Sequence, residues 1–340
     1  MRVLVGISGG VDSAVTALLL KKQGYEPVAV NLMLTDKTEN IGAKQCAEFL
    51  NIEFHSVDMT AEFDALVKMP FSDTYLCGKT PNPCVICNRY IKFGLMAELI
   101  ERFECEKLAT GHYVRCDFDE NSGRWLLKKG IDAKKDQSYF LWSLSQKQLS
   151  KTLFPLGELT KDQVREIARS ENIPCASNPE SQDVCFIPDG DCAAFIAEFT
   201  GNMPVEGDFV DTSGKVLGRH RGIAAYTIGQ RKGLGISSDA PLYVLNKDAS
   251  SNTVILGRNE ELFSDTVHIT DLNLISVDGA DMEINVQAKI RYSNTSAEAV
   301  LKVDGNSGIL KFAQNQRAPS PGQSAVFYDG DVVVGGGIIL

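Results

Sequence analysis

The feature that most constrains this 340-residue chain is a glycine-rich loop between an apolar run and a helical pattern. Val3–Ile7 has the composition of a strand buried in a parallel sheet. The loop Gly6–Ser13 overlaps its end, and Val11–Gly24 then carries apolar residues at helical spacing, with Gly24 suited to the position after the last turn. A strand, a glycine-rich turn and a helix in this order open a βαβ unit, which predicts an α/β fold.

Strand and helix patterns continue to alternate through the first half of the chain. Pro27–Met33, Glu53–Met59 and Lys107–Tyr113 are expected to be strands, and Asn88–Phe103 an amphipathic helix. This alternation predicts a parallel sheet covered on both faces, whose ligands bind outside the carboxyl ends of the strands. The region is completed by a capping box at Thr160–Gln163 that opens a helix through Arg169, a polar loop over 172–191, and a short helix over 189–200.

Beyond Pro204 the pattern changes to short Val- and Ile-rich alternating runs separated by turn residues, for example at Thr212–Gly214 and Asp304–Asn306. Such spacing predicts all-β structure. We therefore expect a parallel-sheet α/β domain over residues 1–203, a small β-rich central domain over 204–265, and a C-terminal β-barrel over 266–340.

The loop Gly6–Ser13 has the chemistry of a polyphosphate site, the alternative being a plain glycine turn. Its glycines let backbone N–H groups approach a ligand, the helix N-terminus adds a positive dipole end, and Ser8 and Ser13 supply hydroxyl groups. The Walker A Lys-[Ser/Thr] pair is missing, and the dinucleotide pattern G-x-G-x-x-G does not fit. Because a carboxylate would repel phosphates, Asp12 is expected to act through a cation such as Mg²⁺.

Nine cysteines offer a second chemistry. Cys84 and Cys87 lie just before the expected helix, where the partial charge of the helix N-terminus, Arg89 and Lys92 are expected to lower a thiol pKa. Cys185, in the polar loop, is the second candidate for a reactive thiol. We expect Cys46, Cys105, Cys175 and Cys192 to be small buried hydrophobes. An alternative for Cys77, Cys84 and Cys87 is a zinc or iron–sulfur site.

The charge balance is acidic, with 34 Lys and Arg against 44 Asp and Glu, a net charge of −10. This argues against a general polyanion binder but leaves room for local basic patches. Arg124–Lys151 carries seven Lys or Arg against two Asp, and Lys215–Ser238 carries five with no acid. The sequence starts with a strand-like run too short for a signal peptide, and no apolar run is long enough to cross a bilayer, so we expect a cytoplasmic protein without a membrane partner.

The motif S-G-G-x-D-S in Gly6–Ser13 resembles the signature of PP-loop ATP pyrophosphatases, which have an adenine nucleotide α-hydrolase-like fold and adenylate a substrate oxygen. Further segments resemble, within that class, the tRNA-specific 2-thiouridylases of bacteria, over essentially the whole chain. The matching segments are Thr80–Phe93, Ala109–Tyr113, Lys135–Phe140, Ser181–Phe186, Thr227–Gly235, Arg291–Tyr292, Pro321–Tyr328 and Gly335–Ile339.

This resemblance implies roles for individual residues. Cys185 would carry a persulfide and Cys87 would be the nucleophilic partner thiol, able to close a disulfide with Cys185. ATP would be held by Gly6, Ile7, Ser8, Gly9, Gly10, Val11, Asp12, Ser13, Met33 and Gly111. Asn82, Pro83 and Cys84 would approach the target base, and His112, Lys135, Asp136, Gln137, Arg291, Tyr292 and Gln323 would make other tRNA contacts.

The chain departs from the family pattern in two places. Many members have Asp where this chain has Cys84, and the stretch after Met33 is shorter than expected. The first departure leaves any role of that acid open, and the second concerns the mouth of the ATP site or the contact with a sulfur donor.

The resemblance implies an ATP- and Mg²⁺-dependent enzyme that adenylates the C2 oxygen of the wobble uridine of tRNA and replaces it with persulfide sulfur, giving 2-thiouridine, AMP and pyrophosphate. A persulfide-donating sulfur-relay protein or a cysteine desulfurase would be its partner. One alternative is a PP-loop amide-forming ligase that acts on an adenylated small molecule. Another is an ATP-binding sensor that docks RNA without chemistry.

Overall fold

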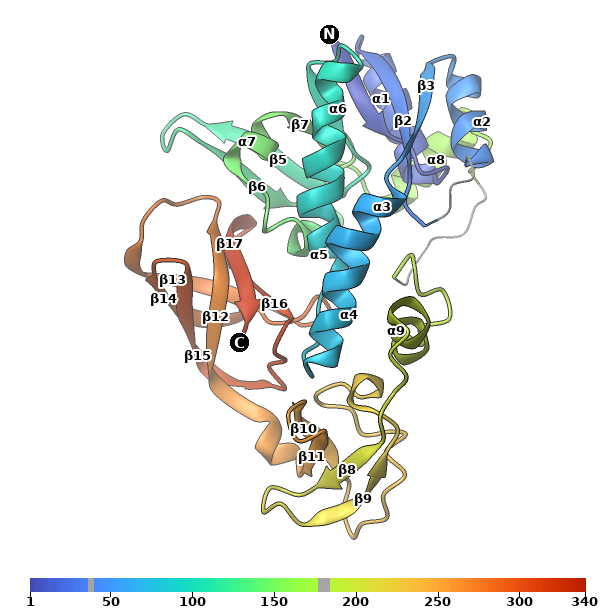
Figure 1. Ribbon diagram of the computed structural model, residues 1–340. Coiled ribbons are helices and arrows are strands. Elements are labelled where there is room, and N and C mark those ends of the chain that lie inside the picture. Colours follow the sequence, from blue (N-terminus) through green and yellow to red (C-terminus); the bar gives the residue numbers. More distant parts are fainter. Residues whose placement is uncertain (36–39, 177–183) are drawn as a thin grey trace.

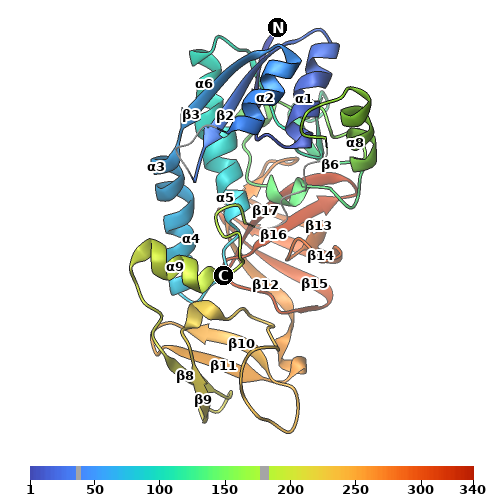
Figure 2. The same cartoon turned by 90° about the vertical axis from the view of Figure 1, so that its right-hand side faces the viewer.

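The computed structural model describes residues 1–35, 40–176 and 184–340. The parallel-sheet domain lies at the top in Figures 1 and 2, a small β-sheet lies at the bottom, and a barrel stands beside the helices that run between them. Within the described residues, no helix combines the length and apolar character that a membrane span needs.

The first sheet has five parallel strands in the order β3-β2-β1-β4-β7, as expected for an α/β fold. Its central strand alternates between two cores, because Val3 and Val5 face one hydrophobic cluster and Leu4 faces the other. The strands are β1 (Arg2–Gly6), β2 (Glu26–Met33), β3 (Glu53–Asp58), β4 (Lys107–Ala109) and β7 (Thr152–Leu153). The expected strand 107–113 is therefore shorter, and its last four residues form a loop at the carboxyl end of the sheet.

The expected first helix is confirmed, with Gly24 in the left-handed conformation just after it, and so is the capping box at Thr160. The helix expected over 88–103 starts earlier, at Pro83, and its middle is π-helical over Asn88–Leu95. The α-helices are α1 (Val11–Lys22), α2 (Ile41–Leu50), α3 (Thr60–Phe63), α4 (Met69–Leu76), α5 (Pro83–Cys87), α6 (Met96–Arg102), α7 (Gln146–Ser150), α8 (Lys161–Ser170) and α9 (Cys192–Thr200).

The second half is β-structure, as its turn spacing predicted. A four-stranded sheet in the order β10-β11-β8-β9 is followed by β12–β17, whose ends pair through β12 and β17 to close a barrel. The strands are β8 (Gly207–Val210), β9 (Val216–His220), β10 (Tyr243–Asp248), β11 (Thr253–Gly257), β12 (Phe263–Leu274), β13 (Asp281–Lys289), β14 (Ala297–Asp304), β15 (Ser307–Arg317), β16 (Ser324–Asp329) and β17 (Val332–Ile339).

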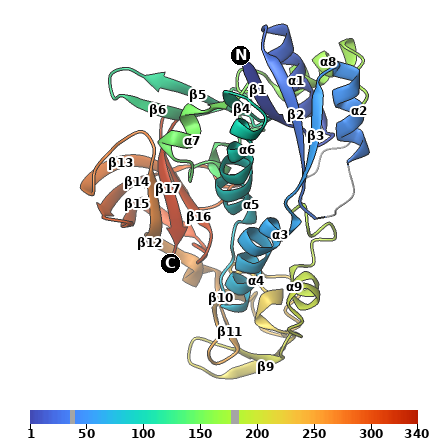
Figure 3. The ribbon, with the colours of Figure 1, turned by 45° about the horizontal axis from the view of Figure 1, so that its top comes forward.

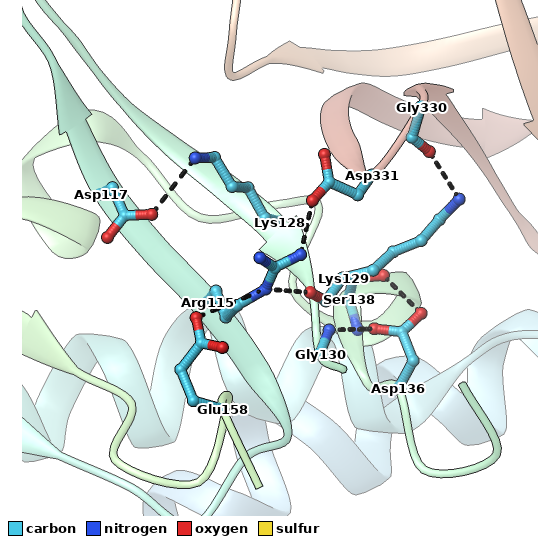
Figure 4. A network of polar contacts seen from close by, with 10 residues as sticks. All are labelled: Arg115, Asp117, Lys128, Lys129, Gly130, Asp136, Ser138, Glu158, Gly330 and Asp331. Atoms are coloured by element: carbon cyan, nitrogen blue, oxygen red, sulfur yellow. Dashed lines mark hydrogen bonds and ion pairs between the residues drawn. The ribbon is translucent and has the colours of Figure 1, made fainter. Parts of the chain in front are cut away.

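A hairpin from the first half of the chain, β5 (Val114–Asp119) and β6 (Arg124–Lys129), joins the sheet of the barrel (Figure 3). Figure 4 shows the polar network at this junction. Arg115 pairs with Asp331, Lys128 pairs with Asp117 at 3.2 Å, and Lys129 Nζ donates to the carbonyl of Gly330 at 2.8 Å. Much of the basic segment Arg124–Lys151 is thus committed to contacts within the protein.

Candidate active site

The glycine-rich loop lies at the carboxyl end of β1, where the strand order changes direction between β1 and β4. Gly9 has φ +77°, and a Cβ there would lie 2.9 Å from Asn40 Oδ1, so the tight turn requires glycine. Ser13 Oγ accepts from Ser8 N at 3.2 Å and donates to the Gly10 carbonyl at 3.0 Å. Gly10, the N-cap of α1, has no side chain to cap the helix. The first backbone N–H groups of α1 therefore suit the binding of an anion.

Other predicted ATP residues surround this cradle. Gly111 follows β4, and a Cβ there would lie 3.1 Å from the backbone carbon of Asp12, so glycine permits this close approach. Met33 is the last residue of β2 and is half-buried at the same edge of the sheet. Asn40, which the sequence analysis did not select, caps α2 and donates to the Ser8 carbonyl at 3.0 Å. The shorter stretch after Met33 includes residues 36–39, which lie outside the described residues.

The carboxylate of Asp12 is already held by protein groups. Lys161 Nζ donates to its two oxygens at 2.7 and 2.8 Å, and the Tyr113 hydroxyl donates to Oδ1 at 2.7 Å. Three donors occupy part of the acceptor capacity of this carboxylate, and the expected role of Asp12 toward a phosphate-bound Mg²⁺ stays a prediction. Lys161 is the first residue of α8, where the helix dipole disfavours a cation. A lysine at this unfavourable helix position is the sequence signal by which Lys161 could have been recognised as a candidate site residue.

The predicted lowering of the thiol pKa values is wrong. Cys87 is buried, and burial raises its pKa to about 11 because a thiolate loses its hydration there. The nearby charge of Lys92 lowers that pKa but does not offset burial. Arg89 makes no comparable contribution, since its guanidinium pairs with Asp271 at 2.7 Å.

The three candidate thiols share one electrostatic environment. Burial raises the pKa of both Cys84 and Cys185, Lys92 lowers each, and the two thiols raise the pKa of Cys87 in turn. Both Cys84 and Cys185 reach the surface, whereas Cys87 is 8% exposed. The residues before Cys185 in its motif, 181–183, lie outside the described residues. The predicted pair of reactive thiols is thus placed within the range of a single cation.

The alternative metal site finds no support in the geometry. Among the residues that the structure describes, no three His, Cys, Asp or Glu side chains are grouped so as to hold a metal ion. Of the cysteines expected to be buried, Cys46, Cys105 and Cys175 are buried, but Cys192 is only half-buried. The Cys46 thiol donates to Cys175 Sγ at 3.3 Å inside the core between α1, α2 and α8.

Several residues expected to contact tRNA are engaged inside the protein. His112 is 8% exposed, packs against Phe93 and Phe154, and hydrogen-bonds Thr110 Oγ1 at 2.8 Å. Burial and the charge of Lys92 hold its pKa well below its ordinary value, so the ring is neutral. His112 therefore lies behind the site surface rather than on it.

Asp136 organises the loop that follows β6. Its carboxylate is buried and accepts from the Gly130 N–H, the Ser138 N–H and the Ser138 hydroxyl at 2.9–3.2 Å (Figure 4). Gln137 Oε1 accepts from the Tyr113 N–H at 2.9 Å. Lys135, between them and the surface, is half-buried. The segment Lys135–Gln137, predicted to contact tRNA, is thus hydrogen-bonded to Tyr113, whose hydroxyl in turn donates to Asp12.

Arg291 and Tyr292 differ in their surroundings. Arg291 Nη2 donates to the carbonyls of Ile228 and Ala318 and to Ser320 Oγ, at 2.6–3.1 Å. These contacts join the central sheet region to the barrel, so its guanidinium serves a domain junction. Tyr292 is 41% exposed and lies against Phe140, with ring centroids 4.6 Å apart. Of the two, Tyr292 offers a surface to a ligand.

The remaining predicted residues lie on the segment that leads to the thiols. Asn82 is the N-cap of α5, Pro83 is its buried first residue, and Cys84 follows. Gln323, from the turn before β16, donates through Nε2 to the Thr80 carbonyl at 3.0 Å. Gln323 thus contacts the thiol-bearing segment from the barrel.

Comparison with known proteins shows which family the chain resembles. Three family models match: "tRNA methyl transferase HUP domain" over residues 1–189, "tRNA methyl transferase PRC-barrel domain" over 193–258, and "Aminomethyltransferase beta-barrel domain" over 264–339. The middle match includes α9, which our expected boundary at residue 203 leaves in the first domain. A solved structure titled "Crystal structure of a 4-thiouridine synthetase - RNA complex with bound ATP" gives a TM-score of only 0.40 at 16% identity, covering 59% of this chain and 50% of that one.

Curated relatives match over nearly their full length. The "tRNA-specific 2-thiouridylase MnmA 1" of Caldanaerobacter subterraneus subsp. tengcongensis is 48% identical, with 99% of this chain and 97% of that protein covered. The "tRNA-specific 2-thiouridylase MnmA" of Clostridioides difficile is 44% identical, with coverages of 99% and 98%. With this identity along its whole length, the chain belongs to the tRNA-specific 2-thiouridylase family.

Proposed function

We propose that this protein is an ATP-dependent tRNA-uridine 2-sulfurtransferase that forms 2-thiouridine at the wobble position. The observation that carries the proposal is the identity of 48% and 44% with tRNA-specific 2-thiouridylases along nearly the whole chain. Within the site, Lys92 adds an electrostatic link. Its charge acts on Cys84, Cys87 and Cys185 and also on His112, the residue next to Gly111 at the nucleotide loop. One cation thus connects the thiols to the edge of the phosphate cradle, which favours a reaction in which sulfur meets a nucleotide-activated substrate.

In the first step the C2 oxygen of a flipped-out uridine attacks the α-phosphate of ATP, and pyrophosphate leaves. The Gly6–Ser13 loop would hold the phosphates through its backbone N–H groups and the N-terminus of α1. The Lys161–Asp12 pair would fix the first turn of that helix. Magnesium accompanies ATP in many phosphate sites, where it neutralises phosphate charge, and Asp12 would be the residue that holds it at the cradle. No step is assigned to the metal.

In the second step the terminal sulfur of a Cys185 persulfide bonds to C2 of the uridine, and AMP leaves. The Cys87 thiolate then attacks Cys185 Sγ, which breaks the bond to the transferred sulfur and forms a Cys87–Cys185 disulfide. In the other order, Cys87 attacks first and releases hydrosulfide, which displaces AMP. Either order ends with 2-thiouridine, AMP and a disulfide that an external thiol must reduce.

The exposure of Cys185 suits delivery of sulfur from a persulfide-donating relay protein or a cysteine desulfurase. Exposed Tyr292, with Phe140 beside it, offers a stacking surface for a base of the tRNA. We assign tRNA binding to the barrel and keep the domain limits near residues 203 and 265. The reaction is assigned to the cytoplasm, where tRNA is found.

The test is pyrophosphate release from ATP with and without bulk tRNA, together with nucleoside analysis of the tRNA. We expect pyrophosphate only when tRNA is present, and 2-thiouridine when a persulfide donor is added. An amide-forming ligase would release pyrophosphate with a small-molecule substrate and no RNA. A sensor would bind ATP without releasing pyrophosphate, and either outcome would contradict the proposal.

A further inference from the structure

The barrel holds the polypeptide segment that carries the thiols. We call residues Thr80–Cys87 the thiol segment and Pro321–Gln323 the barrel turn. The Thr80 N–H donates to the Pro321 carbonyl at 2.8 Å, and Gln323 Nε2 donates to the carbonyls of Thr80 and Pro81 at 3.0 and 3.4 Å. These bonds join parts of the chain more than 240 residues apart.

The contact is too close to tolerate a side chain at its centre. Gly322 has φ +90°, and a Cβ there would lie 3.0–3.1 Å from the backbone N, O and C of Thr80. Two independent constraints therefore require glycine at this position, the left-handed conformation and the approach of another backbone. The barrel turn fits against the thiol segment backbone to backbone.

The first three residues of the thiol segment, Thr80–Asn82, belong to no helix or strand. Two of its residues, Pro81 and Pro83, have no N–H, and Asn82 makes no side-chain capping bond to α5. By contrast, two residues of the barrel turn are bonded to Ile339 of β17. The Gly322 N–H donates to the Ile339 carbonyl and the Ile339 N–H donates to the Gln323 carbonyl, each at 2.8 Å. The rigid partner in this contact is the barrel.

We propose that Gln323 and Gly322 are positioning residues that set where α5 begins, and hence where Cys84 meets the target base and where Cys87 meets Cys185. The inference rests on the proposed function and changes the role that resemblance gave Gln323, from a tRNA contact to a support of the catalytic thiols. The Gln323 amide nitrogen already serves two carbonyls of the thiol segment. Misplacement of a reacting group by about 1 Å is enough to slow a reaction by about 100-fold.

The experiment compares Gln323→Ala and Gln323→Glu with a matched control, Gln316→Ala. Gln316 belongs to β15 of the same barrel, and its Nε2 donates to the Gln314 carbonyl. Three readouts are taken: the Kd for tRNA from filter binding, the single-turnover thiolation rate of protein with a preloaded Cys185 persulfide, and the alkylation rate of Cys87 by iodoacetamide without tRNA or ATP, followed by peptide mass spectrometry.

We expect both Gln323 variants to lose about tenfold or more in single-turnover rate, as the loss of one to two hydrogen bonds would give, while the Kd for tRNA stays within about twofold. Cys87 alkylation should become several-fold faster, because the segment loses its support. Gln316→Ala should match the wild type in all three measurements. A Gln323→Ala protein that alkylates like the wild type and only binds tRNA more weakly would overturn the inference.

The alkylation readout separates this inference from the proposed function, because it needs neither ATP nor tRNA. If the wild type forms no 2-thiouridine while Gln323→Ala still accelerates Cys87 alkylation, the proposed function fails and the support role stands. Gly322→Ala provides a second variant at the same contact. It should show the same acceleration when its circular dichroism spectrum matches the wild type.

Discussion

Lys161 Nζ lies 2.7 and 2.8 Å from the two carboxylate oxygens of Asp12, so the helix that starts at Lys161 is joined to the first turn of the nucleotide-loop helix. The Lys161 side chain is 9% exposed and that of Asp12 is 36% exposed. Without the lysine, the Asp12 carboxylate would face incoming phosphates with its charge uncompensated by that ammonium, although the Tyr113 hydroxyl would still donate to it. The Lys161–Asp12 pair is therefore expected to reduce the repulsion between the Asp12 carboxylate and the phosphates of ATP.

Lys161→Met should weaken ATP binding by about tenfold or more, because the uncompensated Asp12 carboxylate repels the phosphates. The measurement is isothermal titration with ATP. Lys22→Met is the matched control, since Lys22 and Glu171 form an exposed ion pair between the other ends of the same two helices. Equal ATP affinity in Lys161→Met and the wild type would exclude this role.

The Cys87 thiol should react with iodoacetamide along a pH profile whose midpoint lies near 11 rather than near the ordinary value of about 8.5. Burial favours the protonated form, so reactivity is low at neutral pH and rises as pH increases. Lys92→Met should lower the alkylation rate at pH 9 further, because Lys92 lowers this pKa. The exposed Cys77 is the internal reference. An unchanged rate in Lys92→Met would contradict the electrostatic link.

Lys135→Ala should reduce the slope of log affinity for tRNA against log salt by roughly 0.7 to 0.9, if Lys135 neutralises one phosphate. Arg291→Ala should leave this slope unchanged. Instead it should lower the melting temperature by roughly 5 °C, because three hydrogen bonds at the junction of the central region and the barrel are lost. Lys311→Ala, at an exposed barrel pair with Asp265, is the control for both measurements. A smaller salt slope in Arg291→Ala would show instead that Arg291 contacts a tRNA phosphate.

Lys247 should make the stability depend on pH. It is 6% exposed, its Nζ donates to the Tyr226 carbonyl at 2.8 Å, and burial lowers its pKa to about 8. Between this value and the unfolded value of about 10.4, the unfolded chain binds more protons, so the free energy of unfolding rises with pH in that window. Below pH 8 the buried ammonium costs up to about 3 kcal/mol.

Urea unfolding of the wild type and Lys247→Met at pH 7 and pH 9.5 measures this dependence. The difference in unfolding free energy between the two proteins should shift in favour of the wild type by about 2 kcal/mol at the higher pH. A difference that is independent of pH would show that the amine is neutral at both values or exposed in the native state.

The α/β half and the β-rich half could be predicted from the sequence because each has a local pattern. Val3–Ile7 and the glycine loop place the nucleotide site at a strand end, and the turn spacing after Pro204 predicts strands. The pairing of β6 with β17 could not be predicted, because it joins Lys128 to Val332 and depends on long-range packing. The helix before Asn88 was missed, although Pro83 is compatible with a first helical turn and is a signal for the earlier start.

The candidate site shows the same difference between local motifs, which the sequence reveals, and long-range contacts, which it does not. Residues in compact motifs, such as Gly9, Cys84 and Cys87, could be identified from sequence alone. Their environment could not, since the raised pKa of Cys87 comes from burial by distant residues, and the pairing of Lys161 with Asp12 spans 149 positions. Arg291 shows the reverse case, because a basic residue in a matching motif is engaged by backbone carbonyls that only the folded chain brings near.

The central claim is that adenylation and sulfur transfer are separate steps carried by different residues. The most direct measurement follows pyrophosphate release and 2-thiouridine in one assay with tRNA, ATP and a persulfide donor, for the wild type, Cys87→Ser, Cys185→Ser and the control Cys77→Ser. We predict that both site variants still release tRNA-dependent pyrophosphate while forming no 2-thiouridine, because serine cannot carry or cleave a persulfide, and that Cys77→Ser behaves as the wild type. Wild-type levels of 2-thiouridine from a folded Cys185→Ser protein would contradict the account.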